Sequence, residues 1–135
     1  MSDLTGAWLG TYWQNGEPTR FEVTFVQANN ALSGRILDDS NLGEAQLGGD
    51  VTGRRVSFTK RYITAAAPPI QYTGTVSEDD GFMSGVWQIS PTSARGKKQT
   101  GNWEAHRTGD DLVADLKQQI ERKPALAGPI PVGAN

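Results

Sequence analysis

The sequence predicts an all-β protein in which eight short antiparallel strands close into an up-and-down barrel. Up to residue 107, apolar and polar residues alternate in short runs rich in Val, Ile, Thr, Phe, Tyr and Trp, which is typical of strands buried on one face. Turn-forming residues recur about every dozen residues, too closely for parallel crossovers. Closure into a barrel is expected because it removes the two exposed edges of such a sheet.

Each strand is expected to end at residues that adopt positive φ or bond their own backbone, such as Asn15-Gly16 and Asn29-Asn30. The predicted strands occupy about residues 6–14, 20–28, 31–38, 43–51, 54–63, 69–77, 82–89 and 100–107.

After residue 107 the apolar period changes from that of a strand to that of a helix. Leu112, Leu116 and Ile120 fall at helical spacing, and Pro124 ends the pattern. The sequence therefore predicts three parts: a barrel over 1–107, a helix over 108–123 and an extended, Pro-rich tail over 124–135.

The composition is that of an ordinary globular protein and excludes several functions. The 135 residues include 13 Lys and Arg against 15 Asp and Glu, whereas a dedicated nucleic-acid binder needs a basic excess. Cysteine is absent, which excludes disulfides and thiol catalysis. With no long apolar run and no secretory pattern at the N-terminus, we expect a cytoplasmic protein that does not contact membranes.

Catalysis and metal binding are not expected from the titratable residues. His106 is the single histidine, and it should face outward because Trp103 and Arg107 should face inward. Without a second histidine or a cysteine, neither a metal site nor a nucleophile–histidine arrangement is predicted. We therefore expect a protein that is not an enzyme and that holds no cofactor.

Lys60 is the most unusual polar residue, because Phe58 and Tyr62 share its predicted inner face. A charge inside a barrel must be paired or hydrated. Two interpretations stay open. Lys60 could form an ion pair near the rim with Asp38 or Glu44, or reach water with its tip. Alternatively, it could anchor an anionic or carbonyl-bearing ligand.

Large rings on the inner face could either fill the barrel or line a cavity, since an eight-stranded barrel has room for side chains or for one small ligand. The residues that we predict to contact a ligand are Tyr12, Lys60, Tyr62, Tyr72, Trp87 and Trp103. Trp13 should point outward, and an outward tryptophan is typical of a homo-oligomer or partner interface.

Gly6-Ala7-Trp8 at the start of the first strand and Arg107 at the end of the last are similar to the signature of calycins, the group of lipocalins, fatty-acid-binding proteins and avidins. In that group the tryptophan packs against a basic residue of the final strand at the closed end of the barrel. The resemblance implies that Trp8 and Arg107 close this barrel. A guanidinium can lie over an indole face while donating hydrogen bonds to nearby carbonyls.

Thr5-Gly6-Ala7-Trp8 followed by Phe21-Glu22-Val23-Thr24 resembles the start of an avidin in particular. The avidin ligand site uses Asn, Ser and Tyr on early strands and Asp on the last strand. Here Gly10 follows the first motif and the last strand offers Glu104 and His106, so the resemblance does not imply biotin binding.

Two functions from different classes fit this sequence. The first is a non-enzymatic calycin-like barrel that binds one small, largely apolar molecule, with an acidic or carbonyl group as a further feature. The second is a protein-interaction or assembly module whose barrel is filled with side chains. Such a module would act through its outer face at Trp13, the C-terminal helix and the tail.

Overall fold

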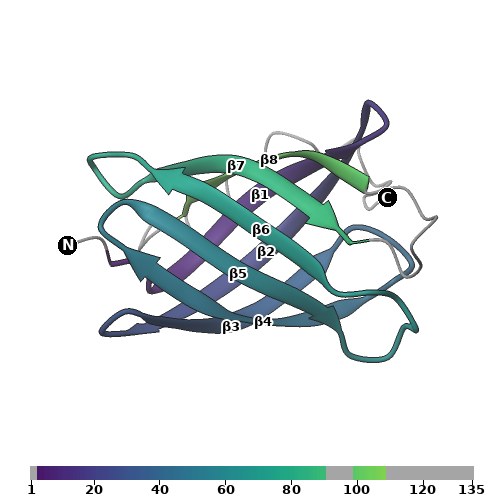
Figure 1. Cartoon of the computed structure of the whole chain (residues 1–135), viewed down its shortest axis with the longest axis horizontal. Helices are drawn as coiled ribbons and strands as arrows, with labels where there is room; N and C mark the ends of the chain where they lie inside the picture. The colour runs from purple at the N-terminus through teal and green to yellow at the C-terminus, as the bar shows by residue number, and fades with distance from the viewer. Residues whose placement is uncertain (1–2, 91–98, 109–135) are drawn as a thin grey trace, which may run out of the picture.

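The computed structural model describes residues 3–90 and 99–108, which form eight antiparallel strands closed into a barrel (Figure 1). Each strand pairs with the next along the chain, and the last pairs with the first. The strands are β1 (Gly6–Gln14), β2 (Glu17–Ala28), β3 (Ala31–Asp38), β4 (Glu44–Thr52), β5 (Arg55–Tyr62), β6 (Ile70–Val76), β7 (Phe82–Ile89) and β8 (Gln99–Arg107).

The predicted eight-stranded antiparallel barrel is therefore confirmed. The predicted helix over 108–123 and the tail over 124–135 lie outside the described residues, apart from Thr108. The described part of the chain contains no helix.

The strand that departs most from its predicted position is β2, which begins at Glu17 rather than near residue 20. Pro18 lies in this extension, opposite Trp13 of β1. On its other side β2 pairs with β3 only from Phe21 onward. The missing N–H of Pro18 therefore costs no ladder hydrogen bond, because no partner strand lies on that side.

The hairpin turns follow the residues that the sequence places there. Asn15 and Gly16 adopt φ of 53° and 82°, the positive values that a tight two-residue turn needs. Asn29 (φ 57°) and Gly53 (φ 61°) mark the turns after β2 and β4. These turns are short enough to set the register of the strands that they join.

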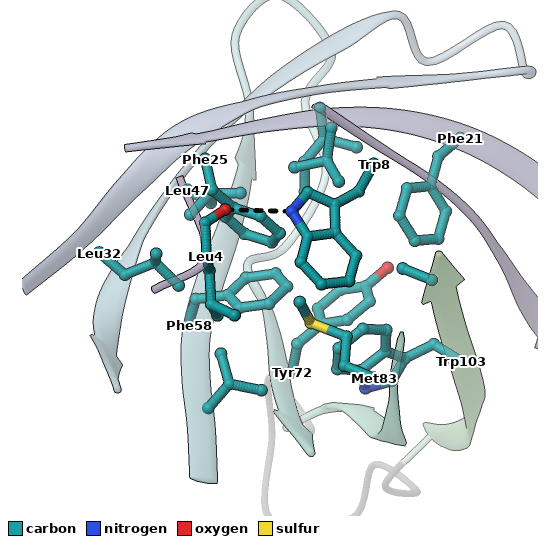
Figure 2. Packing of buried hydrophobic residues seen from close by; sticks show 14 of the residues in the cluster. Leu4, Trp8, Phe21, Phe25, Leu32, Leu47, Phe58, Tyr72, Met83 and Trp103 are labelled. Carbon is teal, nitrogen blue, oxygen red and sulfur yellow. Dashed lines mark hydrogen bonds between the residues drawn. The ribbon is translucent and has the colours of Figure 1, made fainter. Parts of the chain in front are cut away.

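Alternate side chains of every strand fill the barrel with a chain of aromatic contacts (Figure 2). The ring of Phe58 lies at its centre, with ring-centroid distances of 5.7 Å to Phe25, 4.9 Å to Tyr72 and 5.8 Å to Trp103. Trp8 continues the chain toward the N-terminal end of β1, with its ring centroid 6.1 Å from that of Phe25. Much of the interior is thus a packed core, as expected of a small barrel.

Glycines on the inner face make room for these rings. A Cβ added at Gly74 would lie 2.8 Å from the Trp103 ring, and one at Gly101 would lie 2.6 Å from the indole nitrogen of Trp87. Both distances are well inside van der Waals contact. A side chain at either position would displace a tryptophan that is now buried.

Trp8 and Arg107, the predicted closing pair, lie against each other at one end of the barrel. The Arg107 guanidinium lies 4.7 Å from the centroid of the Trp8 ring. Its N–H groups donate to three backbone carbonyls, those of Thr5 at 2.8 Å, Asp3 at 2.5 Å and Asp80 at 2.9 Å. The arginine therefore joins the N-terminal segment, the β6–β7 loop and the last strand.

Replacing Trp8 with alanine should lower the free energy of unfolding by about 3–5 kcal/mol, because the ring is buried and its loss leaves a cavity beneath Arg107. Urea denaturation followed by circular dichroism measures this loss. Val86→Ala is the control, because Val86 is 44% exposed and should cost no more than about 0.5 kcal/mol. A Trp8→Ala loss as small as that of the control would contradict the closing role.

Candidate functional site

The end of the barrel opposite Trp8 holds a cavity of about 230 Å³. Here β1 and β5 end, and β6 and β8 begin. Its lining is mainly aromatic and aliphatic, and residues of the loops after β3 and β5 border its open rim. The lining residues are Tyr12, Gln14, Leu42, Tyr62, Ala67, Pro68, Ile70, Tyr72, Trp87, Ile89 and Gln99.

A buried ion pair lies beside this cavity. The Lys60 ammonium is 2.7 Å from each carboxylate oxygen of Asp38, and both side chains are fully buried. Lys60 projects inward from β5 and Asp38 from the last position of β3, with β4 between them. The predicted ion pair is therefore present with Asp38, whereas Glu44 pairs with Arg35 at 2.9 Å on the surface.

The three tyrosines of the chain surround the same ammonium. The Lys60 nitrogen lies 4.9 Å from the ring centroids of Tyr12 and Tyr62 and 5.7 Å from that of Tyr72. These distances fall within the range of cation–π attraction. A carboxylate and three ring faces thus enclose the ammonium, which leaves it no contact with solvent.

Two of the tyrosines bind the carboxylate through their hydroxyls. Tyr62 donates to Asp38 Oδ2 at 2.5 Å, and Tyr12 donates to the same oxygen over a longer 3.4 Å. Asp38 therefore accepts hydrogen bonds from Lys60 and from both phenols. The cluster of Asp38, Lys60, Tyr12 and Tyr62 therefore meets the cavity through its two tyrosines, with the ion pair behind them.

The ionisation of the cluster reflects burial and the charge of Asp38. Burial raises the pKa of Tyr12, Tyr62 and Tyr72, and the negative charge of Asp38 raises each of them further. For Lys60, burial lowers the pKa and the neighbouring carboxylate opposes that effect. Each of the three phenols therefore loses its proton at a higher pH than free tyrosine does.

Of the residues predicted to contact a ligand, the structure brings four together at the cavity: Tyr12, Tyr62, Tyr72 and Trp87. Lys60 lies behind the tyrosines rather than in the lining. Trp103 packs deeper in the core, with its ring centroid 5.5 Å from that of Tyr72, and does not line the cavity.

The prediction missed several lining residues. Gln14 and Ile89 lie on the inner face at the strand ends, so the alternation of β1 and β7 already contained the signal for them. Ala67 and Pro68 belong to the loop after β5, where no alternation of residues indicates which side chains point toward the cavity.

The outer face carries the two remaining candidates. His106 is exposed there as predicted, and its Nε2 lies 3.6 Å from a carboxylate oxygen of Glu104. Trp13 borders a shallow outer groove of about 740 Å³ over β7 and β8. Within residues 3–90 and 99–108, no group of three or more histidines and carboxylates is placed to hold a metal ion.

Comparison of the chain with protein-family models and with curated proteins finds no match in either. Among the described residues there is also no helix that is long and apolar enough to cross a membrane.

Lys60→Met should lower the free energy of unfolding by about 3–5 kcal/mol, because it leaves the Asp38 carboxylate buried without its cation. Replacing both partners, as Lys60→Met with Asp38→Leu, should recover most of that loss because no unpaired charge remains. Arg35→Met is the control, since its exposed ion pair with Glu44 should contribute less than about 1 kcal/mol. If Lys60→Met were as mild as Arg35→Met in urea denaturation, the pair would not be structural.

The folded protein should show less tyrosinate absorbance near pH 10, the ordinary pKa of tyrosine, than the unfolded chain does. The unfolded chain releases these protons there while the folded chain holds them, so stability should fall as the pH rises above about 10. The pKa of Lys60 is lowered in the folded protein, so between that pKa and the ordinary 10.5 the unfolded chain binds more protons at this residue. Over that range Lys60 makes the free energy of unfolding rise with pH, which partly offsets the decrease caused by the tyrosines.

A spectrophotometric titration measures this directly, because the chain has no other tyrosine. Tyr62 and Tyr72 should ionise only with loss of the barrel's circular dichroism, whereas in denaturant all three tyrosines should ionise near pH 10. A tyrosine that ionises near pH 10 with the fold intact would show that one phenol is not enclosed.

Proposed function

We propose that this protein is a non-enzymatic binder of one small, flat, largely apolar molecule, held in the cavity at the open end of the barrel. The observation that carries the proposal is the cavity itself. Protein interiors seldom contain voids larger than a water molecule, yet this barrel holds about 230 Å³ of open space next to a packed core. An apolar cavity of about 150 Å³ accommodates one benzene ring. The volume therefore suits a single ring with a short substituent.

The walls favour a planar ligand. Tyr12 and Trp87 meet edge to face, with ring centroids 6.4 Å apart and planes at 77°. Tyr62 and Tyr72 add two more rings to the lining, while Ile70 supplies an aliphatic surface. Aromatic side chains contribute large contact areas and prefer stacked or edge-to-face partners.

The electrostatics favour a neutral ligand. Lys60 is 0% exposed and its ammonium already bonds both oxygens of Asp38, so it cannot meet an acidic group without breaking that pair. The described lining itself contains no cation. Burial of an unpaired anion costs several kcal/mol or more. The sequence left open whether the ligand has an acidic group or a carbonyl group. We therefore propose that it has a neutral carbonyl.

Assembly through the outer face is a second candidate, supported by the groove beside Trp13. The groove is lined on β7 by Val86, which is 44% exposed, and by Asn102 on β8. Glu104 is the one charged side chain among its described lining residues. A weakly charged surface next to a tryptophan is typical of a protein interface.

The purified 135-residue protein should bind acetophenone, a neutral single ring with a carbonyl, with one site per chain by isothermal titration calorimetry. Ile89→Trp should weaken this affinity by roughly tenfold or more, because the new ring occupies the cavity. Val86→Trp adds the same ring to the outer face of the same strand and should leave the affinity unchanged.

Absence of acetophenone binding by the unmodified protein, or equal binding by Ile89→Trp, would contradict the cavity function. Native mass spectrometry of the same preparation then separates the two candidates. A small molecule retained by the chain supports the cavity, whereas an oligomer without bound ligand that Val86→Trp disrupts supports assembly.

A further inference from the structure

Tyr72 carries a buried hydroxyl that has no hydrogen-bond partner among the described residues. The side chain is 1% exposed, extends inward from β6 and lines the cavity. Figure 2 shows its hydroxyl directed across the barrel toward Phe21. Most buried polar groups in folded proteins are hydrogen-bonded, so an unpaired hydroxyl in this position needs an explanation.

The other polar groups of the interior are paired, which makes Tyr72 the exception in the described core. The hydroxyls of Tyr12 and Tyr62 donate to Asp38. The indole N–H groups donate to backbone carbonyls, each at 3.0 Å, and these donors are Trp8, Trp87 and Trp103. The barrel thus satisfies its buried donors wherever it can reach an acceptor.

The packing of Tyr72 does not require a hydroxyl. Its ring stacks on Phe58 with a centroid distance of 4.9 Å and an interplanar angle of 10°, and it meets Trp103 edge to face. Phenylalanine would make both contacts without burying a polar atom. Removal of an unpaired buried hydroxyl is expected to be neutral or favourable for folding.

We propose that the Tyr72 hydroxyl is the polar anchor of the ligand and donates a hydrogen bond to a neutral acceptor such as a carbonyl oxygen. This inference rests on the proposed function, since it names the group that recognises the molecule in the open-end cavity. It also gives a role to the one phenol that has no hydrogen-bond partner among the described residues and whose side chain lines the cavity.

The charges around Tyr72 determine which acceptor group a ligand can present to its hydroxyl. Burial and the nearby Asp38 charge keep Tyr72 protonated, so that its hydroxyl is available as a donor. A carboxylate acceptor would lie close to Asp38, and Lys60 is already bonded to both Asp38 oxygens. A ketone, amide or ester oxygen accepts the same hydrogen bond without bringing a charge into the barrel.

Two probes that differ in one group test the anchor. Acetophenone and ethylbenzene are similar in shape, but the first has a carbonyl where the second has a methylene. Their affinities are measured by isothermal titration calorimetry on the unmodified protein, on Tyr72→Phe and on Thr73→Val. The last variant removes a hydroxyl from the outer face of the same strand and serves as the control.

In Tyr72→Phe the ratio of acetophenone to ethylbenzene affinity should fall roughly tenfold, as expected from the loss of one hydrogen bond to an otherwise unpaired group. The affinity for ethylbenzene and the thermal midpoint should stay close to those of the unmodified protein. Thr73→Val should leave the ratio unchanged.

A ratio that Tyr72→Phe does not alter, with both probes bound, would overturn the anchor and leave the cavity function intact. A large fall in the thermal midpoint of Tyr72→Phe without ligand would also overturn it, because the hydroxyl would then already have a partner in the empty protein. If neither probe binds the unmodified protein, the proposed function itself fails.

Discussion

The open half of this barrel is organised by one buried charge, the ammonium of Lys60. A lone ammonium in an apolar interior would lose its proton or draw in water. Here Asp38 neutralises it at 2.7 Å, and the faces of three tyrosine rings enclose the rest. Because Tyr12 and Tyr62 also bond the carboxylate, their hydroxyls are directed toward Asp38 rather than into the cavity. The position of the cavity walls thus depends on the pair.

The two ends of the barrel use a cation in different ways. At the closed end Arg107 lies over Trp8 and donates to three backbone carbonyls, so its charge contacts the polar main chain of the loops. At the open end Lys60 has a carboxylate partner and no solvent contact. Arginine suits the first position because its five donors form a planar fork, and lysine suits the second because its charge is compact. Arg107 and Trp8 fill their end of the barrel, whereas the Lys60–Asp38 pair lies beside an open cavity.

The alternation of apolar and polar residues was enough to predict most of this fold. It placed the eight strands, put Lys60 inside with Phe58 and Tyr62, and put His106 outside. It could not choose between Asp38 and Glu44 as the partner of Lys60, because that choice depends on which face of the barrel each carboxylate occupies. Asp38 is the last inward residue of β3, whereas Glu44 begins β4 facing Arg35 on the surface.

The size of the cavity was beyond sequence reasoning, since it is the difference between the barrel volume and the summed volumes of all inward side chains. For the same reason the sequence did not separate Trp103, which lies deep against Phe58, from Trp87, which lines the cavity. The unpaired hydroxyl of Tyr72 was equally hidden. Tyrosines at positions 12, 62 and 72 look alike in the sequence, and only the three-dimensional distances to Asp38 distinguish them.

A buried ion pair is weak support for stability, because well-packed apolar residues often serve as well or better. The Lys60–Asp38 pair is better understood through what it does to the tyrosines. Asp38 binds the hydroxyls of Tyr12 and Tyr62 and neutralises Lys60, so that the ion pair behind these tyrosines presents no free charge to the cavity. Tyr72 is then left as the one phenol whose donor is not committed within the described core. Under the proposed function, the aromatic walls would select a ligand by shape and the Tyr72 hydroxyl would select it by one acceptor atom, which is the recognition expected of a small neutral carbonyl compound.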